Sequence, residues 1–188
     1  MSPRSYRLGR REEAVARTRT AILAAARTVL ASGDPALFSA GAVARRAGVA
    51  RITVYNQFGS KGGLLRELAE GVRASGATPQ AEVAEPRDSL QRRIVASCTA
   101  WADDPALVRR LPAEAAAHLE APGEDRALAE RLAAAGQLRP GCSIKEAGDV
   151  IGTLTSFPVF DRLHKDGRRT SAAVAEILLR LAAAILRA

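Results

Sequence analysis

The spacing of apolar residues predicts helices along almost the whole length of the chain. Apolar residues recur at spacings of three and four, whereas the alternation of β-branched and aromatic residues that marks strands is nearly missing. In residues 12–32, one face collects Val15, Ile22, Ala26, Val29 and Leu30, and the helix stop Gly33-Asp34-Pro35 follows. The pattern therefore predicts an all-α protein of about nine helices.

Two short helices are expected next, before a longer one. Ser39 is a suitable N-cap for a helix that runs through about Ala47 and closes at Gly48. A second short helix is predicted around Arg51–Phe58. Gly59-Ser60 breaks it, and Ser60 can cap a longer helix whose apolar face holds Leu64, Leu65, Leu68 and Val72.

The remainder predicts further amphipathic helices after a linker or kink at 76–80. They fall near 87–102, 105–119, 124–135, 143–156 and 170–187. We accordingly expect two domains, residues 1–75 and residues 76–188.

Positive charge is concentrated in the first third of the chain. The protein has 188 residues and a net charge of +8. Residues 1–66 hold 12 basic and three acidic side chains, whereas residues 67–188 hold 16 basic and 17 acidic ones. Such a localised field favours a partner lined with phosphates, although a basic face that only meets solvent is the alternative.

Several classes of protein are disfavoured by what the sequence lacks. No apolar run is long enough for a membrane span, and the N-terminus has no apolar signal core, so we expect a cytoplasmic protein. Two cysteines and two histidines without ligand spacing predict no metal site and no cofactor. There is no GxSxG, P-loop, HExxH or strand-linked GxGxxG motif, which disfavours an enzyme. A redox role for Cys98 and Cys142 stays open.

Residues 39–61 have the pattern of a helix-turn-helix, in which two short helices meet at a glycine-containing turn and the second enters the major groove. The residues spaced to pack inward are Val43, Ala44, Ala47, Val49, Val54 and Phe58. Those left facing outward are Arg51, Thr53, Tyr55, Asn56 and Gln57, whose side chains suit base edges and phosphates. A helical hairpin inside some other bundle would give a similar pattern.

At these residues the sequence resembles the tetracycline-repressor (TetR) family of bacterial transcriptional regulators. The similarity covers about 50 residues, at 18–33 and 42–65. It depends on the ordered run Ala47-Gly48-Val49, Thr53-Val54-Tyr55, Phe58, Ser60-Lys61 and Leu64-Leu65.

The resemblance implies roles for particular residues. Ser39 would contact a phosphate, Tyr55 would anchor another, and Lys61 would hold a third at a helix N-terminus. Residues 1–11, with four arginines, resemble the arms that some members lay along a minor groove. The full set of candidate DNA contacts is Ser39, Arg51, Ile52, Thr53, Tyr55, Asn56, Gln57, Lys61 and Arg19.

Two departures from the family pattern bear on these expectations. Ile52 stands where many relatives have a small residue, so it could touch a thymine methyl group or change how closely the helix approaches DNA. Gly62-Gly63 replaces the acidic residue common after Ser60-Lys61, which removes a capping-box partner and should weaken the first turn of the fourth helix.

The resemblance also implies that the C-terminal helices dimerise and enclose a small-molecule pocket. Two apolar stripes support a four-helix dimer interface formed by Ile144, Ala147, Ile151, Leu154, Val174, Ile177, Leu178, Leu181 and Ile185. The alternative is that both stripes belong to the core of one subunit. The candidate effector residues are Cys98, Trp101, Leu107, His118, Phe157 and Phe160. A tryptophan on an amphipathic helix is more often core, and a lone histidine is more often satisfied or exposed.

The sequence thus predicts a homodimeric, ligand-responsive transcriptional repressor that binds a pseudo-palindromic operator in double-stranded DNA. The helix at 61–75 would transmit the signal of an unknown small-molecule effector. Alternatives are an effector-independent DNA-binding or structural protein and, less favoured, an α-helical enzyme.

Overall fold

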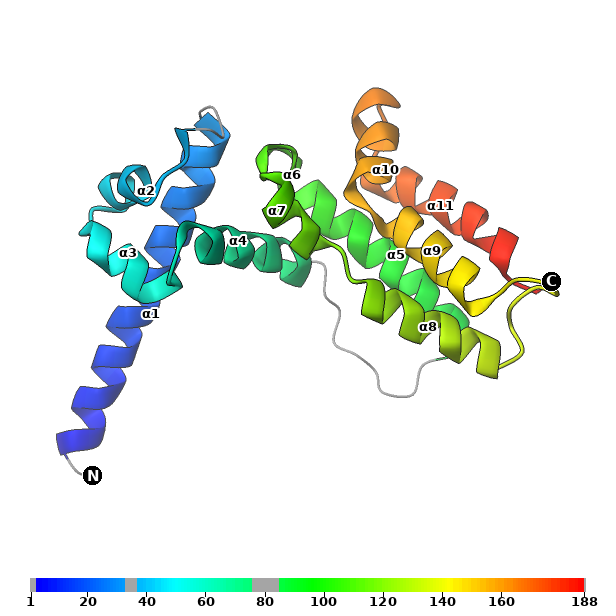
Figure 1. Cartoon of the computed structure of the whole chain (residues 1–188), viewed down its shortest axis with the longest axis horizontal. Coiled ribbons are helices and arrows are strands. Elements are labelled where there is room, and N and C mark those ends of the chain that lie inside the picture. Colours follow the sequence, from blue (N-terminus) through cyan, green and yellow to red (C-terminus); the bar gives the residue numbers. More distant parts are fainter. Residues whose placement is uncertain (1–2, 33–36, 76–84, 188) are drawn as a thin grey trace. The chain divides into compact units, whose positions relative to one another are not determined.

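The computed structural model describes residues 3–32, 37–75 and 85–187, with side chains from residue 12 onward (Figure 1). Within these ranges the regular structure is helical, and the β-type pairing is an isolated bridge between Leu138 and Leu186. The prediction of an all-α fold is confirmed for this part of the chain. The helix stop at 33–35 and the linker at 76–80 lie outside the described residues.

The chain forms two compact units. The first comprises Met1–Leu68 together with Arg109–Ala115, and the second comprises Ala69–Val108 together with Ala116–Ala188. Three helices, α4 (Lys61–Ser75), α6 (Pro105–Arg110) and α7 (Ala113–Ala116), contribute residues to both units. The expected domain boundary after residue 75 remains a prediction.

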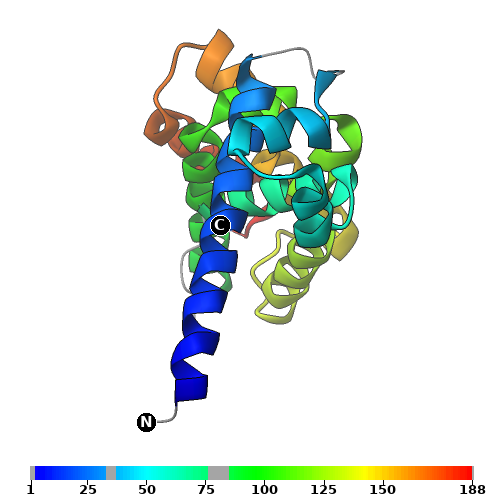
Figure 2. The same ribbon diagram turned by 90° about the vertical axis from the view of Figure 1, so that its left-hand side faces the viewer.

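The first unit is built on α1 (Pro3–Ser32), against which α2 (Ala40–Ala47) packs, and α3 (Arg51–Phe58) packs on α2. Both views show α2 and α3 beside the C-terminal half of α1, while its N-terminal half extends beyond them (Figures 1 and 2). The buried residues that form this core are Ile22, Ala26, Leu30, Phe38, Val43, Val54, Phe58 and Leu64. The core therefore comes largely from the helix faces that the periodicity predicted, but Val15, expected on the same face of α1, is 45% exposed and Val29 is half-buried.

The helix boundaries in this unit follow the predicted caps. The Ser39 Oγ accepts the N–H of Ala42 at 3.2 Å and begins α2. Gly48 ends α2 at φ 68°, in the left-handed region that residues with a Cβ seldom adopt, and its N–H bonds back to the last turn. The Ser60 Oγ accepts the N–H of Gly63 at 3.0 Å and begins α4.

The second unit packs α5 (Pro86–Asp103) against α8 (Pro122–Ala134), α9 (Ile144–Thr155) and α11 (Ser171–Ala182). Its core includes Leu90, Ile94, Trp101, Leu132, Ile151, Phe160 and Leu178. The helices expected at 87–102, 124–135 and 143–156 are present with shifted ends. At 170–187 the α-helix ends at Ala182 and gives way to a 3₁₀ turn, Ala183–Ile185.

Two stretches differ from the prediction: residues 105–119, which are divided between the two units, and residues 157–166 of the second unit. The helix expected at 105–119 is broken at Leu111-Pro112 into α6, α7 (Ala113–Ala116) and a 3₁₀ turn, because proline lacks the N–H that would continue the ladder. The sequence also gave no separate signal for α10 (Phe157–Asp161) or for the π-turn Arg162–Asp166 that follows it. Pro158, in the first turn of α10, is the feature that could have indicated a new helix.

Among the described helices, none has the combination of length and apolar character needed to cross a lipid bilayer.

Candidate nucleic-acid interface

The turn between α2 and α3 fixes how the second of these helices is presented. After Gly48, the N–H of Val49 bonds to the Ala44 carbonyl at 3.0 Å, and the N–H of Thr53 bonds to the Ala50 carbonyl at 2.9 Å. Ala44 is buried and has only a methyl side chain, which permits close packing. The result is the helix–glycine turn–helix arrangement expected from the sequence.

The two faces of α3 have opposite characters. Val54 and Phe58 are buried and attach the helix to the core. Arg51, Ile52 and Asn56 are exposed, while Thr53, Tyr55 and Gln57 are half-buried. Because neither Ile52 nor any of the five residues expected to face outward is buried, the surface of α3 that the sequence assigned to DNA is available to a partner. Ala47 and Val49, also expected to pack inward, are only half-buried.

Arg51 and Tyr55 form a pair on the surface of α3. Arg51 Nη2 donates a hydrogen bond to the Tyr55 hydroxyl at 3.0 Å, and the guanidinium carbon lies 5.4 Å from the ring centroid. The tyrosine oxygen accepts in this bond, so its own O–H remains able to donate. The pair therefore offers both a cation and a hydroxyl donor to a phosphate oxygen.

Ser39 and Lys61 mark the starts of the two helices that flank α3. Both are exposed. The Ser39 oxygen accepts the capping bond of α2, which leaves its hydroxyl proton free to donate. Lys61 is the first residue of α4, and its Nζ lies 5.7 Å from the ring centroid of Phe38. A cation at a helix N-terminus suits an anionic ligand, since the helix dipole adds to its field.

Arg19 is engaged within the protein. Its Nη1 donates to the Gln57 carbonyl at 2.8 Å, its Nη2 pairs with Glu67, and its guanidinium carbon lies 4.6 Å from the Phe58 ring centroid. The residue thereby joins α1, the end of α3 and α4. These contacts give Arg19 a role in holding the recognition helix, and its assignment as a DNA contact stays a prediction.

The N-terminal arm has a helical backbone from Pro3 onward, continuous with the rest of α1. Residues 1–2 lie outside the described residues. The resemblance implied an arm that lies along a minor groove; because the backbone is helical, residues 3–11 would meet a partner as an extension of α1.

One residue of the first unit was not indicated by the sequence. Arg110 Nη1 donates to the Leu30 carbonyl at 3.1 Å and also to that of Ala31. These carbonyls belong to the last turn of α1, where helical partners are missing and a cation is favoured. No local signal could have revealed this contact, because the partners are 80 residues apart.

Three of the effector candidates, Trp101, Phe157 and Phe160, lie next to one another, and the assignment of the set to an effector pocket stays a prediction. Trp101 and Phe157 meet edge to face with centroids 5.8 Å apart, and Phe157 lies 6.4 Å from Phe160. The Trp101 Nε1 donates to the Thr155 carbonyl at 3.0 Å, which is the environment of a core tryptophan. His118 is exposed, whereas Cys98 and Leu107 are buried. His164, which the sequence did not single out, stacks on Phe160 at 4.9 Å.

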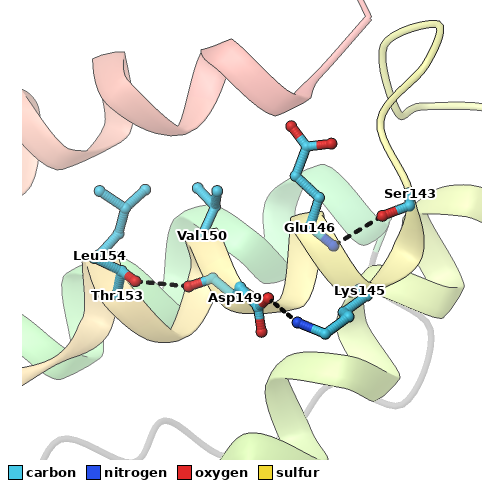
Figure 3. Close-up of a pocket in the computed structure, with 7 residues that line it drawn as sticks. All are labelled: Ser143, Lys145, Glu146, Asp149, Val150, Thr153 and Leu154. Atoms are coloured by element: carbon cyan, nitrogen blue, oxygen red, sulfur yellow. Dashed lines mark hydrogen bonds and ion pairs between the residues drawn. The ribbon is translucent and has the colours of Figure 1, made fainter.

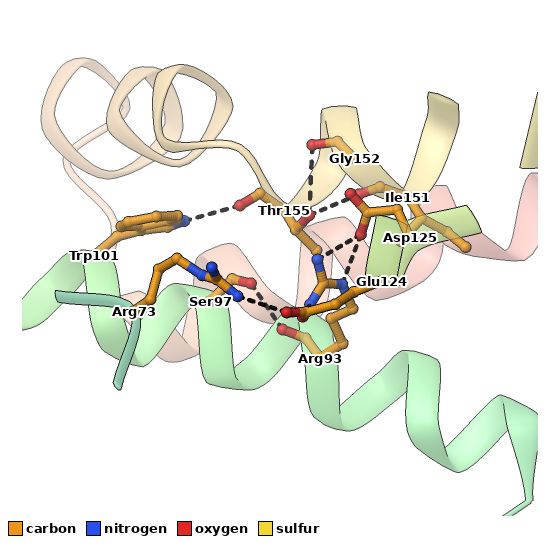
Figure 4. A network of polar contacts seen from close by, with 9 residues as sticks. All are labelled: Arg73, Arg93, Ser97, Trp101, Glu124, Asp125, Ile151, Gly152 and Thr155. Carbon is orange, nitrogen blue, oxygen red and sulfur yellow. Dashed lines mark hydrogen bonds and ion pairs between the residues drawn. The ribbon is translucent and has the colours of Figure 1, made fainter. Parts of the chain in front are cut away.

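A polar network lies close to Trp101 in the second unit (Figure 4). Arg93 donates from Nε to the Asp125 carboxylate at 2.7 Å and from Nη1 to Glu124 at 2.9 Å, and Arg73 bonds Glu124 at 2.6 Å. Asp125 is only 5% exposed. Burial raises the pKa of its carboxyl by more than the neighbouring Arg93 lowers it. The network therefore ties the end of α4 to α5 and α8.

The two cysteines differ in their surroundings. Burial raises the pKa of the Cys98 thiol to about 11, which keeps it protonated at neutral pH. Cys142 is half-buried in the loop before α9. A thiolate is the reactive form, so Cys98 is poorly suited to redox chemistry.

The apolar stripes assigned to a dimer interface are mostly core within one chain. The members that are buried are Ala147, Ile151, Leu154, Val174, Leu178 and Ile185. Ile144 and Leu181 are 39% and 52% exposed, and Ile177 is half-buried. Burial within one chain is what the alternative of a monomer core predicts for the six buried residues, and the assignment of the stripes to a dimer interface stays a prediction.

An open groove of about 390 Å³ runs along α9 (Figure 3). It is lined by Ser143, Lys145, Glu146, Asp149, Val150, Thr153 and Leu154. Val150 and Leu154 form its apolar part, while the Lys145 ammonium pairs with Asp149 at 2.6 Å. None of the six effector candidates lines this groove.

Residues 22–68 match the family model described as bacterial regulatory proteins, tetR family. No curated protein matches the sequence.

Solved structures resemble the chain over most of its length. NalD, described as the secondary repressor of the MexAB-OprM multidrug efflux pump in Pseudomonas aeruginosa, is 22% identical with a TM-score of 0.67, over 91% of this chain and 98% of that one. TylP, a tetR regulator from Streptomyces fradiae, is 22% identical with a TM-score of 0.66, over 92% and 88%. A tetR family transcription regulator from Shewanella sp. PV-4 is 19% identical with a TM-score of 0.61, over 91% and 99%. These likenesses show the fold.

Proposed function

Because residues 22–68 match the model of the tetR family of bacterial regulatory proteins, we propose that this chain is a DNA-binding transcriptional repressor. The observation that carries the proposal is the outward face of α3, which exposes Arg51 and Asn56 while Val54 and Phe58 fix the helix to the core. Asparagine can bond adenine in the major groove, and an arginine can bond either guanine or a phosphate. The excess positive charge of residues 1–66 supplies the attraction to phosphates.

Ser39, Tyr55 and Lys61 would bind the phosphates that flank the recognition helix. The hydroxyl oxygens of Ser39 and Tyr55 act as acceptors within the protein, so their O–H groups can donate to a phosphate, and Lys61 is exposed. Such contacts set the orientation of α3 in the groove and carry no sequence information of their own. Base selection then falls to the residues on its most exposed face.

The repressor would act as a homodimer on a pseudo-palindromic operator. Two recognition helices related by a two-fold axis read half-sites about 34–36 Å apart. The apolar exposure of Ile144 and Leu181, with the groove along α9, supports the outer sides of α9 and α11 as the contact between subunits. The buried members of the two stripes would support this surface from within.

Ligand response is the further part of the proposal. An effector in the second unit would have to bind two conformers with different affinity, and α4 contributes to both units. The pair between Arg73 and Glu124 fixes the C-terminal part of α4 to α8. A protein that binds DNA without an effector is the alternative, and an α-helical enzyme is a less favoured one.

Selection of bound duplexes from a random pool tests the DNA-binding proposal. We expect the protein to enrich a two-fold symmetric motif, and Tyr55→Ala and Lys61→Ala to weaken binding to it at least tenfold. Lys165→Ala is the matched control, since it removes an exposed lysine of the second unit. A specific-to-random affinity ratio near one at several salt concentrations would favour the structural alternative. Failure to retain any duplex at low salt would reject DNA binding.

Sedimentation equilibrium of two charge-introducing variants tests the dimer. Leu181→Glu should raise the dimer dissociation constant at least a hundredfold, because it places a carboxylate in an apolar contact. Val95→Glu changes an aliphatic residue of similar exposure, 42%, on α5 and should leave assembly unchanged. If both variants remain dimers, the subunit contact lies elsewhere.

A further inference from the structure

Ile52 is an apolar residue of α3 that the fold leaves largely exposed. It is 64% exposed, although it belongs to the eight-residue helix that carries the candidate base contacts. At about 100° per residue, it lies about 160° around the helix from Val54, which is buried in the core. Ile52 therefore belongs to the outermost face of the helix, where its side chain meets water unless a partner covers it.

Ile52 is the apolar group at the centre of the outermost face of α3, and its immediate neighbours are polar. Arg51 is bonded to the Tyr55 hydroxyl and lies over its ring, which directs this pair toward a phosphate. Asn56, four residues after Ile52, shares its face and is exposed. The outermost surface of α3 thus combines one amide, suited to adenine, with one branched aliphatic chain.

We propose that Ile52 is a specificity-determining residue that selects thymine by packing on its 5-methyl group. This inference rests on the proposed function, since it needs α3 in a major groove. The thymine methyl is the apolar feature that base pairs present in that groove, where the other groups are hydrogen-bond donors and acceptors. An isoleucine covers the methyl without leaving a polar group unpaired, whereas cytosine or guanine at that position would have a donor or acceptor desolvated against it.

The first experiment repeats the random-pool selection with Ile52→Ala. The wild-type protein should enrich a motif with a strongly preferred thymine in each half-site, and Ile52→Ala should lose the preference at that position while keeping the rest of the motif. Ile52→Val retains a branched side chain and should keep the preference. Because the side chain is exposed, all three proteins should unfold at similar temperatures.

The second experiment removes the methyl group from the DNA. Replacing the preferred thymine by deoxyuridine should weaken wild-type binding about fourfold per half-site, the equivalent of one buried methyl at ~0.8 kcal/mol. The same replacement should have no effect on Ile52→Ala, which already lacks the contact. Thr53→Ala is the parallel arm, because a threonine methyl can also contact thymine. Val95→Ala, which shortens an exposed aliphatic residue of α5, should keep the full uridine effect.

The outcomes distinguish a failure of the Ile52–thymine contact from a failure of the proposed DNA-binding function. If the wild-type protein enriches no motif, the proposed function fails. If a motif is enriched but uridine weakens Ile52→Ala as much as wild type at every thymine, Ile52 does not read a methyl group and the inference is overturned. Loss of the uridine effect in Thr53→Ala alone would overturn it as well, and would assign the contact to Thr53.

Discussion

A side chain's contacts within the fold decide which of the predicted DNA residues can act on a partner. Arg19 and Arg51 are both arginines near the recognition helix, yet Arg19 bonds Glu67 and the Gln57 carbonyl while Arg51 bonds only its neighbour Tyr55 among the contacts described. Arg19 therefore positions α3, and Arg51 is oriented on its surface. Sequence alone could not separate these roles, since the partners of Arg19 lie 38 and 48 residues away.

Cys98 should make the protein less stable in alkaline solution. Its pKa rises from 9.0 to about 11 on folding, so the unfolded chain loses the proton first. Stability from this group is complete below pH 9 and declines as pH rises from 9 to 11, by at most about 2–3 kcal/mol. Urea unfolding of wild type and Cys98→Ala at pH 8 and pH 10 checks this. We expect the stability advantage of the wild type to shrink at pH 10; an advantage equal at both pH values would contradict the prediction.

The Arg93–Asp125 pair should be costly to break from one side only. Arg93→Met leaves Asp125 buried without its partner, and we expect a loss of about 3 kcal/mol at pH 7 in urea unfolding. Removing the cation raises the pKa of Asp125 further above its unfolded value. The loss should therefore be largest above that raised pKa and diminish as acid protonates the carboxyl.

Two comparisons control this experiment. Asp125→Asn removes the desolvated charge and should cost less than Arg93→Met, because Arg93 keeps Glu124. Arg126→Met disrupts an exposed pair with Glu130 and should change stability by about 0.5 kcal/mol or less. A loss for Arg93→Met as small as that for Arg126→Met would show that the buried pair contributes little.

At the scale of elements, local signals predicted the helix-turn-helix closely. Ser39, Gly48 and Ser60 act through hydrogen bonds within four residues, so their effect can be read from neighbouring positions. The apolar faces of α9 and α11 also lie on the helices where the periodicity placed them. Their assignment to a partner could not be made from periodicity, because a stripe has the same pattern whether it faces its own core or a second subunit.

The start of α4 shows where close packing overrides a local rule. The sequence suggested that Gly62-Gly63 merely loses a capping partner. In the structure a Cβ on Gly63 would lie 2.0 Å from the Phe58 carbonyl oxygen, whereas at Gly62 the nearest atom is the Ser60 Oγ at 3.7 Å. Gly63 is therefore required by the approach of α3 to α4, which no pattern of neighbouring residues could have revealed.

Alanine substitutions at this pair should have opposite effects. Gly62→Ala should stabilise the protein by about 0.5–1 kcal/mol, because alanine loses less backbone entropy in a helix. Gly63→Ala should destabilise it by about 1–3 kcal/mol, since backbone must move to admit the methyl group. Thermal unfolding of both variants measures this. Equal shifts of the same sign would mean that the α3–α4 connection relaxes freely.

At the scale of the whole molecule, the salt dependence of DNA affinity reports both the uneven distribution of charge along the chain and the number of subunits bound. The positive excess lies in residues 1–66, so DNA affinity should fall steeply with salt as phosphate contacts release counterions. The logarithm of the binding constant falls with the logarithm of salt concentration by about 0.9 for each phosphate neutralised on duplex DNA. Each substitution in a homodimer alters two such contacts on a symmetric operator.

The salt dependence of Lys61→Ala therefore tests the phosphate contact and the dimer together. If Lys61 binds one phosphate in each of two subunits, the slope should become shallower by about 1.8, against about 0.9 for a single bound subunit. Affinities for the selected operator, measured from 50 to 200 mM salt, give the slope. Lys165→Ala carries the same charge change in the second unit and should leave the slope unaltered. An unchanged slope for Lys61→Ala would remove this lysine from the phosphate contacts, whereas equal changes in both variants would show that net charge, and not position, governs binding.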